Sequence, residues 1–312
     1  MSLAGVAHAA APVDTSGDTG DTGGTRERRR SRVGYLLLLP GMLYLLLFFV
    51  APVGALLLTS LYERVPGGPV GATQPAFRLA NYSEALAAYG PQFGRSFLYA
   101  SIATLLALAI GYPLAYVIGV RCRGRPLLQG MLLVMVIAPF FTSFILRTIA
   151  WKQILADQSL VVGGLKAISV LPDDARLTAT SVAVVAGLTY NFLPFMTLPI
   201  YASLERLDLR LVEAGGDLYA GAASTFRHVT LPLSMPGVAA GTLLTFIPAA
   251  GDYVNAALLG NAGTAMIGNV IDSRFFRVVD YPTAAALSFL LMLAILVLVG
   301  WYVRRSGTED LV

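Results

Sequence analysis

Three polar side chains lie close together within a long apolar stretch of the sequence. Asp252, Tyr253 and Asn255 come directly after Gly251 and a little after Pro248. Proline and glycine interrupt helices, and irregular backbone inside a membrane is tolerated where it lines a cavity. A carboxylate beside an aromatic ring suits an amine cation, which gains charge neutralisation and a cation–π contact. The pattern therefore predicts that Asp252, Tyr253 and Asn255 line a translocation pathway; a structural pairing of Asp252 is the alternative.

Two other apolar stretches carry isolated polar side chains. Arg147 lies in one of them, and Tyr190 and Asn191 lie near the middle of the other. A charge inside a bilayer is costly, so such residues are functional candidates by default. At about 1.5 Å per helical residue, Arg147 and Asp252 both fall in the outer part of the membrane, where they could pair or extend separately to the interface. Arg147, Tyr190 and Asn191 are therefore added to the pathway candidates, with structural roles as the alternative.

Sequence motifs for catalysis and for metal binding are absent. The chain has two histidines, His8 and His228, and one cysteine, Cys122. It contains no GxxxxGK[ST] phosphate-binding loop, no HExxH motif and no Ser/His/Asp arrangement. We therefore predict that the chain is not an enzyme and holds no metal or cofactor, so any ATP hydrolysis must take place on another chain.

The composition places these residues in a membrane protein. Hydrophobic residues make up 56% of the 312 residues and charged residues 13%, whereas soluble domains are about 25% charged. This balance excludes a soluble domain, a disordered protein and a DNA-binding protein. The net charge of +4 comes mostly from arginines beside apolar stretches, so it indicates membrane orientation and no nucleic-acid partner.

Six apolar stretches are long enough to cross a bilayer, for which about 20 residues suffice. The first, residues 33–62, is too long for a signal peptide, whose apolar core has about 7–15 residues, and it should bend near Pro40 or Pro52. The predicted fold is all-α and polytopic, with a disordered basic tail at 1–32 and a short tail at 306–312. The other spans, within a transmembrane domain at 93–305, are 96–120, 127–150, 179–201, 237–258 and 284–303.

Arginine clusters predict the orientation of the spans. The densest clusters, at 26–32, 121–125 and 304–305, all adjoin span ends that lie on the same side in a six-span arrangement. Positive charge next to a span favours the cytoplasmic side. Both termini and the connection at 202–236 are therefore predicted to be cytoplasmic.

The connection at 202–236 is too long to be structureless in a compact protein. Leu204, Leu207, Leu211 and Leu218 recur at helical spacing. A break is expected near residues 220–221, followed by a second short helix at 224–229 that Pro232 and Pro236 end. This helix–turn–helix suits docking into the groove of another protein; a helix resting on lipid headgroups is the alternative.

The same connection resembles the glutamate–alanine–alanine loop of permease subunits of ABC importers. The matching residues are Glu213, Ala214, Asp217, Ala220, Thr225, Phe226, Arg227, Val229, Leu231 and Pro232. In that family the loop forms coupling helices that sit in a cleft of a cytoplasmic ATPase subunit. The resemblance implies an ATPase-coupling role for Glu213, Ala214, Gly215, Asp217, Tyr219, Ala220, Gly221, Arg227, Leu231 and Pro232.

This loop departs from the family pattern in two places. Gly215 and Gly216 replace an alanine and a longer residue, which should weaken the helix by about 0.5–1 kcal/mol per glycine. Tyr219 stands where the family has the glycine of the turn, and a bulky residue is poorly suited to a positive φ. We therefore expect Gly221 to supply the turn.

Further segments resemble the spermidine/putrescine branch of these permeases. They are NYSEAL (81–86), FGRSFLYASIATLLALAIGYPLAY (93–116), APFFTSFILRTIAWKQIL (138–155), FIPAAGDYVNAALLG (246–260) and MIGNVI (266–271). The resemblance implies that the substrate is a polyamine. Opine, iron, thiamine and phosphonate importers have related permeases, and an ion-coupled secondary transporter is the alternative from another class.

The resemblance also implies the partners of the chain. It would be one of two permease subunits, identical or sister chains, in a bacterial inner membrane. A cytoplasmic ATPase dimer would bind ATP and Mg, and an external binding protein would deliver the substrate. This chain would therefore contact the lipid bilayer and three kinds of protein.

Overall fold

The structure is a computed structural model that describes residues 37–217, 219 and 221–306. The predicted tails at 1–32 and 306–312 therefore lie outside the described residues, apart from Ser306. The chain divides into two compact units, Met1–Ala55 and Leu56–Val312. Five described helices are long and apolar enough to cross a membrane, and a bent pair of helices makes a sixth crossing when it is counted as one. The predicted all-α, polytopic fold is confirmed.

The first span is a continuous helix, Leu37–Ser60, which passes Pro40 and Pro52 without a break. A π-helical turn, Leu46–Val50, lies just before Pro52, and α2 (Ala51–Ser60) completes the span. A proline has no N–H and its ring crowds the carbonyl one turn earlier. The wider π turn accommodates that ring, so the helix continues past Pro52, and a bend near Pro40 or Pro52 stays a prediction.

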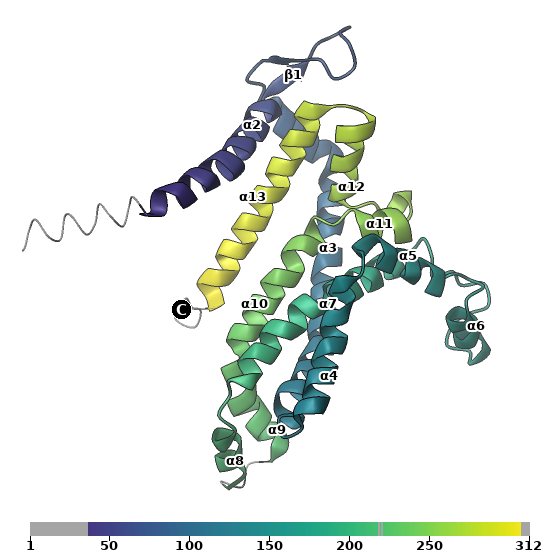
Figure 1. Cartoon of the computed structure of the whole chain (residues 1–312). Helices are drawn as coiled ribbons and strands as arrows, with labels where there is room; N and C mark the ends of the chain where they lie inside the picture. The colour runs from purple at the N-terminus through teal and green to yellow at the C-terminus, as the bar shows by residue number, and fades with distance from the viewer. Residues whose placement is uncertain (1–36, 218, 220, 307–312) are drawn as a thin grey trace, which may run out of the picture. The chain divides into compact units, whose positions relative to one another are not determined.

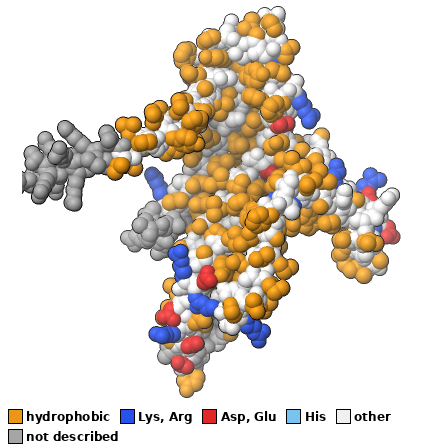
Figure 2. Space-filling view, in the orientation of Figure 1, with side chains coloured by type: hydrophobic (Ala, Val, Ile, Leu, Met, Phe, Trp, Pro, Cys, Tyr) orange, Lys and Arg blue, Asp and Glu red, His pale blue; other side chains and the backbone are white. Residues whose placement is uncertain are grey.

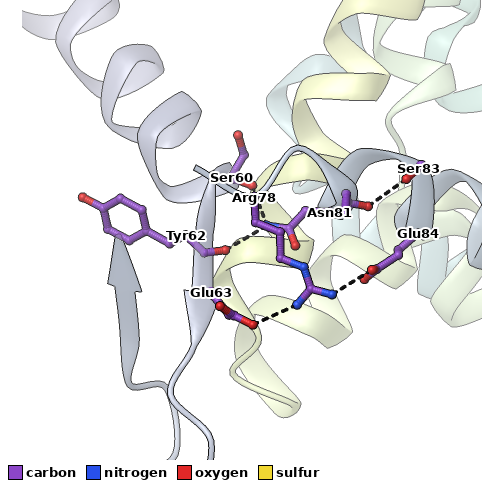
Figure 3. A network of polar contacts seen from close by, with 8 residues as sticks. Ser60, Tyr62, Glu63, Arg78, Asn81, Ser83 and Glu84 are labelled. Carbon is purple, nitrogen blue, oxygen red and sulfur yellow. Dashed lines mark hydrogen bonds and ion pairs between the residues drawn. The ribbon is translucent and has the colours of Figure 1, made fainter. Parts of the chain in front are cut away.

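A polar network fastens the end of α2 to the start of α3 (Ala80–Tyr116) within the second unit (Figure 3). Between them lies a hairpin of β1 (Tyr62–Arg64) and antiparallel β2 (Thr73–Pro75). Asn81 Nδ2 donates to the carbonyl oxygens of Ser60 at 2.9 Å and Tyr62 at 2.8 Å. The Arg78 guanidinium bridges Glu63 at 3.1 Å and Glu84 at 2.8 Å. The hairpin is thus held by buried amide contacts and by an exposed ion-pair bridge.

The second span is longer than predicted, because α3 continues into a π-helical turn, Val117–Arg121, and begins at Ala80. The fourth and sixth spans, α7 (Ser181–Glu205) and α13 (Tyr281–Ser306), lie close to their predicted positions. Hydropathy therefore located these spans well, and it missed only the polar extension of α3.

The third span, predicted at 127–150, is not one continuous helix. It consists of α4 (Pro126–Ile137), a 3₁₀ turn (Ala138–Phe141) and α5 (Phe144–Ile154), with a bend of 101° between the two parts. Pro139 cannot donate a helical hydrogen bond, and Thr142 has extended backbone after it. A short helix, α6 (Leu160–Ala167), follows α5, and the side chain of Ser159 caps it.

The fifth span begins much earlier than predicted. The helix starts at α9 (Ala222–Thr225), passes through a π-helical turn (Phe226–Thr230) and continues as α10 (Leu231–Ala250). Pro232 and Pro236 therefore do not end a helix, because the π turn relieves the crowding before Pro232 just as it does before Pro52. The helix stops before Gly251, so the interruption expected after Pro248 and Gly251 is confirmed and the helix does not reach 258.

Short helices follow the end of α10 and lead into α13. They are α11 (Val254–Leu259), a 3₁₀ turn (Ala262–Thr264), α12 (Ile267–Asp272) and a π-helical turn (Ser273–Arg277). Figure 1 shows α12 beside the end of α3 that lies away from α8 and α9, and α11 beside α5. The break after α10 therefore lies at the opposite end of that helix from the connection at 202–236.

Helices α3, α7 and α10 pack closely because glycines remove side chains from their contacts. A Cβ on Gly237 of α10 would lie 2.6 Å from the carbonyl oxygen of Pro199, and one on Gly241 would lie 2.9 Å from that of Met196. A Cβ on Gly111 of α3 would lie 2.9 Å from Thr197 Oγ1. Small residues at membrane helix contacts allow backbones to approach in this way.

Replacing Gly237 with leucine should destabilise the protein, because the side chain would have to displace the backbone of α7. Overpacking of this kind costs about 1–3 kcal/mol. Thermal unfolding of the purified protein in detergent would measure the loss. Gly94→Leu is the matched control, since no atom lies within 4 Å of a Cβ at that helical position; equal losses in both variants would contradict the close-packing interpretation.

Candidate coupling surface and polar junction

An exposed surface is formed by α8 (Leu209–Asp217) and the segment leading into α9. It comprises the exposed residues Glu213, Ala214, Asp217, Tyr219, Gly221 and Arg227, and we call it the coupling surface. Figure 2 shows charged side chains of both signs gathered at the end of the molecule that α8 and α9 occupy. Seven of the ten predicted coupling residues are thus exposed, these six and Pro232.

The helix before the turn is shorter than the leucine spacing predicted. Leu204 belongs to α7, Leu207 is buried in the connection, and Leu211 is exposed on α8. Asp208 begins the new helix, since its Oδ1 accepts the N–H of Arg210 at 3.0 Å. Leu218 and Ala220 lie outside the described residues.

Gly215 has a packing reason for its departure from the family pattern. A Cβ at Gly215 would lie 3.0 Å from the side-chain oxygen of Thr225, which is buried in α9. Glycine therefore lets α8 lie directly against α9. The helical propensity lost at this position is offset by a closer contact between the two short helices.

The turn between α8 and α9 does not use Gly221 as expected. Tyr219 itself has the positive φ, 59°, and its side chain is 99% exposed. Gly221 has φ −64° and is the N-cap of α9. A left-handed non-glycine residue costs of order 1–3 kcal/mol, so the turn presents a fully exposed tyrosine on strained backbone.

Phe226 connects the coupling surface to α3. Its ring contacts those of Tyr112 and Tyr116 edge-on, at centroid distances of 5.6 and 5.9 Å. Tyr112 also hydrogen-bonds Ser234 of α10 at 2.8 Å. Leu231 is half-buried and Pro232 is exposed, and both lie inside the continuous helix. The coupling surface is therefore joined directly to α10 and through aromatic contacts to α3.

A buried polar junction lies at the other end of α10, where α5, α7 and α11 meet. Asn191 Nδ2 donates to Asn255 Oδ1 at 3.0 Å and to Thr148 Oγ1 at 3.1 Å. Thr148 Oγ1 in turn donates to Asn255 Oδ1 at 3.4 Å. We call Thr148, Asn191 and Asn255 the polar junction; all three are fully buried.

The polar junction brings together two residues that the sequence singled out and one that it missed. Asn191 and Asn255 were pathway candidates, and they bond to each other. Thr148 was not predicted, because a threonine in a helix often bonds its own backbone, as Thr148 Oγ1 also does with the Phe144 carbonyl at 3.0 Å. Its place directly after Arg147 was the one available signal.

Glycines and a cap hold α11 in place. A Cβ on Gly187 of α7 would lie 2.8 Å from Asn255 Oδ1, and one on Gly268 would lie 2.7 Å from the carbonyl oxygen of Gly251. Asp252 is buried, and its Oδ1 accepts the N–H of Asn255 at 2.8 Å. Asp252 therefore caps the first turn of α11, and its carboxylate lies beside the polar junction.

The other pathway candidates are spread around this region. Tyr253 is 48% exposed, and Tyr190 is half-buried with its ring 5.3 Å from that of Trp151. An apolar cavity of about 260 Å³ lies beside Tyr190, between Pro139 and Pro194. Arg147 lies over the ring of Phe144, 5.7 Å from its centroid.

Arg147 and Asp252 do not form the ion pair that was one of the two alternatives. No ion pair among the described residues includes either of them. Within the same part of the chain, no group of three His, Cys, Asp or Glu residues is placed to hold a metal ion.

Comparison with known proteins decides the family. Residues 107–305 match the family described as "Binding-protein-dependent transport system inner membrane component". The chain belongs to this family. The resemblance drawn from the coupling loop is confirmed, and the chain is a transport component of a membrane.

Several relatives carry the name of the branch that the sequence segments indicated. The spermidine/putrescine transport system permease protein PotB of Haemophilus influenzae is 37% identical over 70% of this chain and 75% of its own length. PotB of Escherichia coli is 37% identical over 73% of this chain and 83% of its own length. The inner membrane ABC transporter permease protein YdcU of Escherichia coli is 31% identical, over 69% and 71% respectively.

A solved structure of an ABC transporter shares the fold of this permease. A chain from a bacterial transporter involved in the import of the acidic polysaccharide alginate superimposes with a TM-score of 0.67 over 90% of this chain and 97% of its own. Its sequence identity is 16%, so the similarity establishes the arrangement of helices and nothing about the substrate.

Replacing Asn191 with alanine should lower thermal stability, because it leaves Thr148 and Asn255 with fewer partners in a buried place. Interhelical hydrogen bonds in membranes contribute about 0.6 kcal/mol on average and up to about 1.7 kcal/mol. Thermal unfolding in detergent would measure the loss. Thr189→Ala is the control, since the Thr189 hydroxyl bonds only the Val185 carbonyl of its own helix at 2.7 Å; an equal loss there would contradict a special role for the junction.

Proposed function

We propose that this permease carries a polyamine across a bacterial inner membrane as part of an ATP-driven importer. The observation that supports the ATP-driven mechanism is the coupling surface, exposed and continuous with the helix that ends beside Asp252. The polyamine assignment rests on relatives that are named spermidine/putrescine permeases. The proposal includes both termini on the cytoplasmic side, a cytoplasmic ATPase dimer, a second permease subunit and an external binding protein.

The route from ATP to the pathway would run along one helix. Closure of the ATPase dimer on ATP would move the coupling surface, and the helix Ala222–Ala250 would carry that movement to the break at Gly251. The contacts of Phe226 with Tyr112 and Tyr116 would displace α3 together with this helix. Because an α-helix is stiff over such a length, displacement at one end changes the packing at the other. ATP and Mg would bind on the ATPase, and none would bind this chain.

The residues around the break would receive the substrate. Polyamines are chains of methylene groups with ammonium groups, so a pathway needs negative charge, aromatic faces and apolar walls. Asp252 would supply the charge and Tyr253 an exposed ring for a cation–π contact. Tyr190 and the apolar cavity beside it would contact the methylene groups. Asn191 and Asn255 would hold the helices that frame the route.

Reversing the charge of the coupling surface should prevent assembly with the ATPase. Glu213→Lys is expected to lower co-purification of the ATPase and to lower uptake by at least about tenfold, the size of effect seen when buried interface contacts are lost. Glu84→Lys is the matched control, since this exposed glutamate lies in the first turns of α3, at the end away from α8 and α9. Unchanged assembly and uptake with Glu213→Lys would exclude the docking role.

Removing the charge of Asp252 should lower polyamine uptake without affecting assembly. Asp252→Asn keeps an oxygen that can cap α11, because asparagine is as good an N-cap as aspartate. Uptake of labelled spermidine into proteoliposomes that contain the complete importer should fall in this variant. Exposed Asp174 provides the control variant, Asp174→Asn.

Asp252→Ala separates the two roles of this residue. Normal uptake with Asp252→Asn together with low uptake with Asp252→Ala would mean that Asp252 acts as a helix cap and not through its charge. Low uptake in both variants, with the ATPase still bound, is the result that the pathway proposal requires.

A further inference from the structure

Arg147 has buried donors without acceptors in the conformation described. Its Nε and Nη1 atoms are inaccessible to solvent and have no hydrogen-bond partner among the described residues. Its guanidinium contacts the face of Phe144, which provides some attraction but accepts no conventional hydrogen bond. A buried donor without an acceptor costs about 1–3 kcal/mol, and more when it is charged. The position is therefore unfavourable for Arg147 unless another conformation supplies a partner.

Asp252 lacks a cation, just as Arg147 lacks an acceptor. Its side chain is 8% exposed, and one carboxylate oxygen accepts the N–H of Asn255. No lysine or arginine lies within ion-pair distance of it in the part of the chain that the structure describes. A backbone N–H satisfies part of its hydrogen-bonding capacity but does not neutralise its charge.

The residues that carry the two charges both adjoin the polar junction. Arg147 directly precedes Thr148, whose hydroxyl lies 3.4 Å from Asn255 Oδ1. Asp252 is bonded to the backbone of that same Asn255. Two uncompensated charges of opposite sign thus belong to residues that adjoin the contact between Thr148 and Asn255, and they form no ion pair with each other.

α5, which carries Arg147, and α11, which follows Asp252, are both attached through joints. α5 follows the 101° bend after α4. α11 follows Gly251, where α10 ends and the backbone leaves the helix. A small displacement of α5 along α11 needs no change within either helix, and hinges at the ends of elements are where such displacements are absorbed.

We propose that Arg147 and Asp252 form an ion pair in a second conformation of the transport cycle, and that this pair latches α5 to α11. The proposal rests on the proposed function, because the movement of α10 would drive the change. In the described conformation the latch is open, and α5 and α11 meet through the polar junction and the packing around it. Closing the latch gives Arg147 an acceptor and Asp252 a cation, neither of which the described conformation provides.

Cross-linking tests the approach of the two residues. Cys122 is the only cysteine in the sequence, so Cys122→Ser gives a background without thiols. In this background, Arg147→Cys with Asp252→Cys would be treated with a short bifunctional thiol reagent in the complete importer. We expect the yield of linked product to differ by at least about threefold between the nucleotide-free and the ATP-trapped importer, as a shift between two populations requires.

The control pair is Lys152→Cys with Asp252→Cys. Lys152 is exposed on the same helix as Arg147, so its yield should not follow the nucleotide state to the same extent. Equal yields in both states for the pair at 147 and 252 would overturn the proposal. So would a dependence on nucleotide that the control pair reproduces in full, since that would indicate a movement of α5 without a specific contact.

A double-mutant cycle tests the pairing of the charges. Arg147→Gln and Asp252→Asn should each lower uptake by about tenfold, because each leaves one buried charge without its partner. The double variant should lose about as much as one single variant and not the product of both losses. Lys152→Gln should leave uptake unchanged.

Two results of the cycle would overturn the latch. Losses that multiply in the double variant would mean that the two residues act independently. A loss with Arg147→Gln that changes with the anionic lipid content of the vesicles, and that is indifferent to Asp252, would assign Arg147 to a lipid phosphate. Failure of the proposed function is distinguishable from both, since the wild-type chain would then show no ATP-dependent spermidine uptake and no bound ATPase.

Discussion

The close contact of α10 with α7 is the constraint on which the rest of this permease depends. Where Gly237 and Gly241 face the backbone of α7, no side chain separates the two helices, so they can move only together or by sliding. The helix that makes this contact runs without interruption from Ala222 to Ala250. One end of it adjoins the coupling surface and the other adjoins the break before α11. Because the centre of this helix is packed tightly against α7, a displacement at one end is transmitted to the other end.

Prolines would break this continuity if the backbone did not adjust around them. In both the first and the fifth span a π-helical turn ends two residues before a proline, at Val50 before Pro52 and at Thr230 before Pro232. The wider turn makes room for the ring without ending the helix. Pro139, by contrast, stands in a 3₁₀ turn followed by extended backbone, and there the span does bend. Proline thus leaves a helix continuous in one place and bends it in another, depending on the geometry of the local turn.

These differences explain how far the sequence could predict the structure. Hydropathy located the spans because the chain crosses a bilayer as apolar helices, in which every backbone polar group is hydrogen-bonded. It could not predict whether a given proline ends, bends or merely widens a helix, so the 101° bend of the third span was missed and the fifth span was wrong in extent. At the candidate site, Asn191 and Asn255 could be identified because amides are conspicuous in apolar segments. Thr148 could not, since its hydroxyl has a partner within its own helix, and Tyr219 adopts a positive φ that its residue type disfavours.

The two charges near the break, those of Arg147 and Asp252, need a physical explanation. A membrane protein keeps a buried charge only where its cost is offset, by a partner or by a function that needs it. Asp252 caps α11, but an uncharged asparagine or serine would cap it as well, so capping does not account for the charge. Arg147 has no acceptor in the described part of the chain, so packing alone does not account for it either. Each of these two opposite charges is unexplained alone. An ion pair between Arg147 and Asp252 in a second conformation explains both.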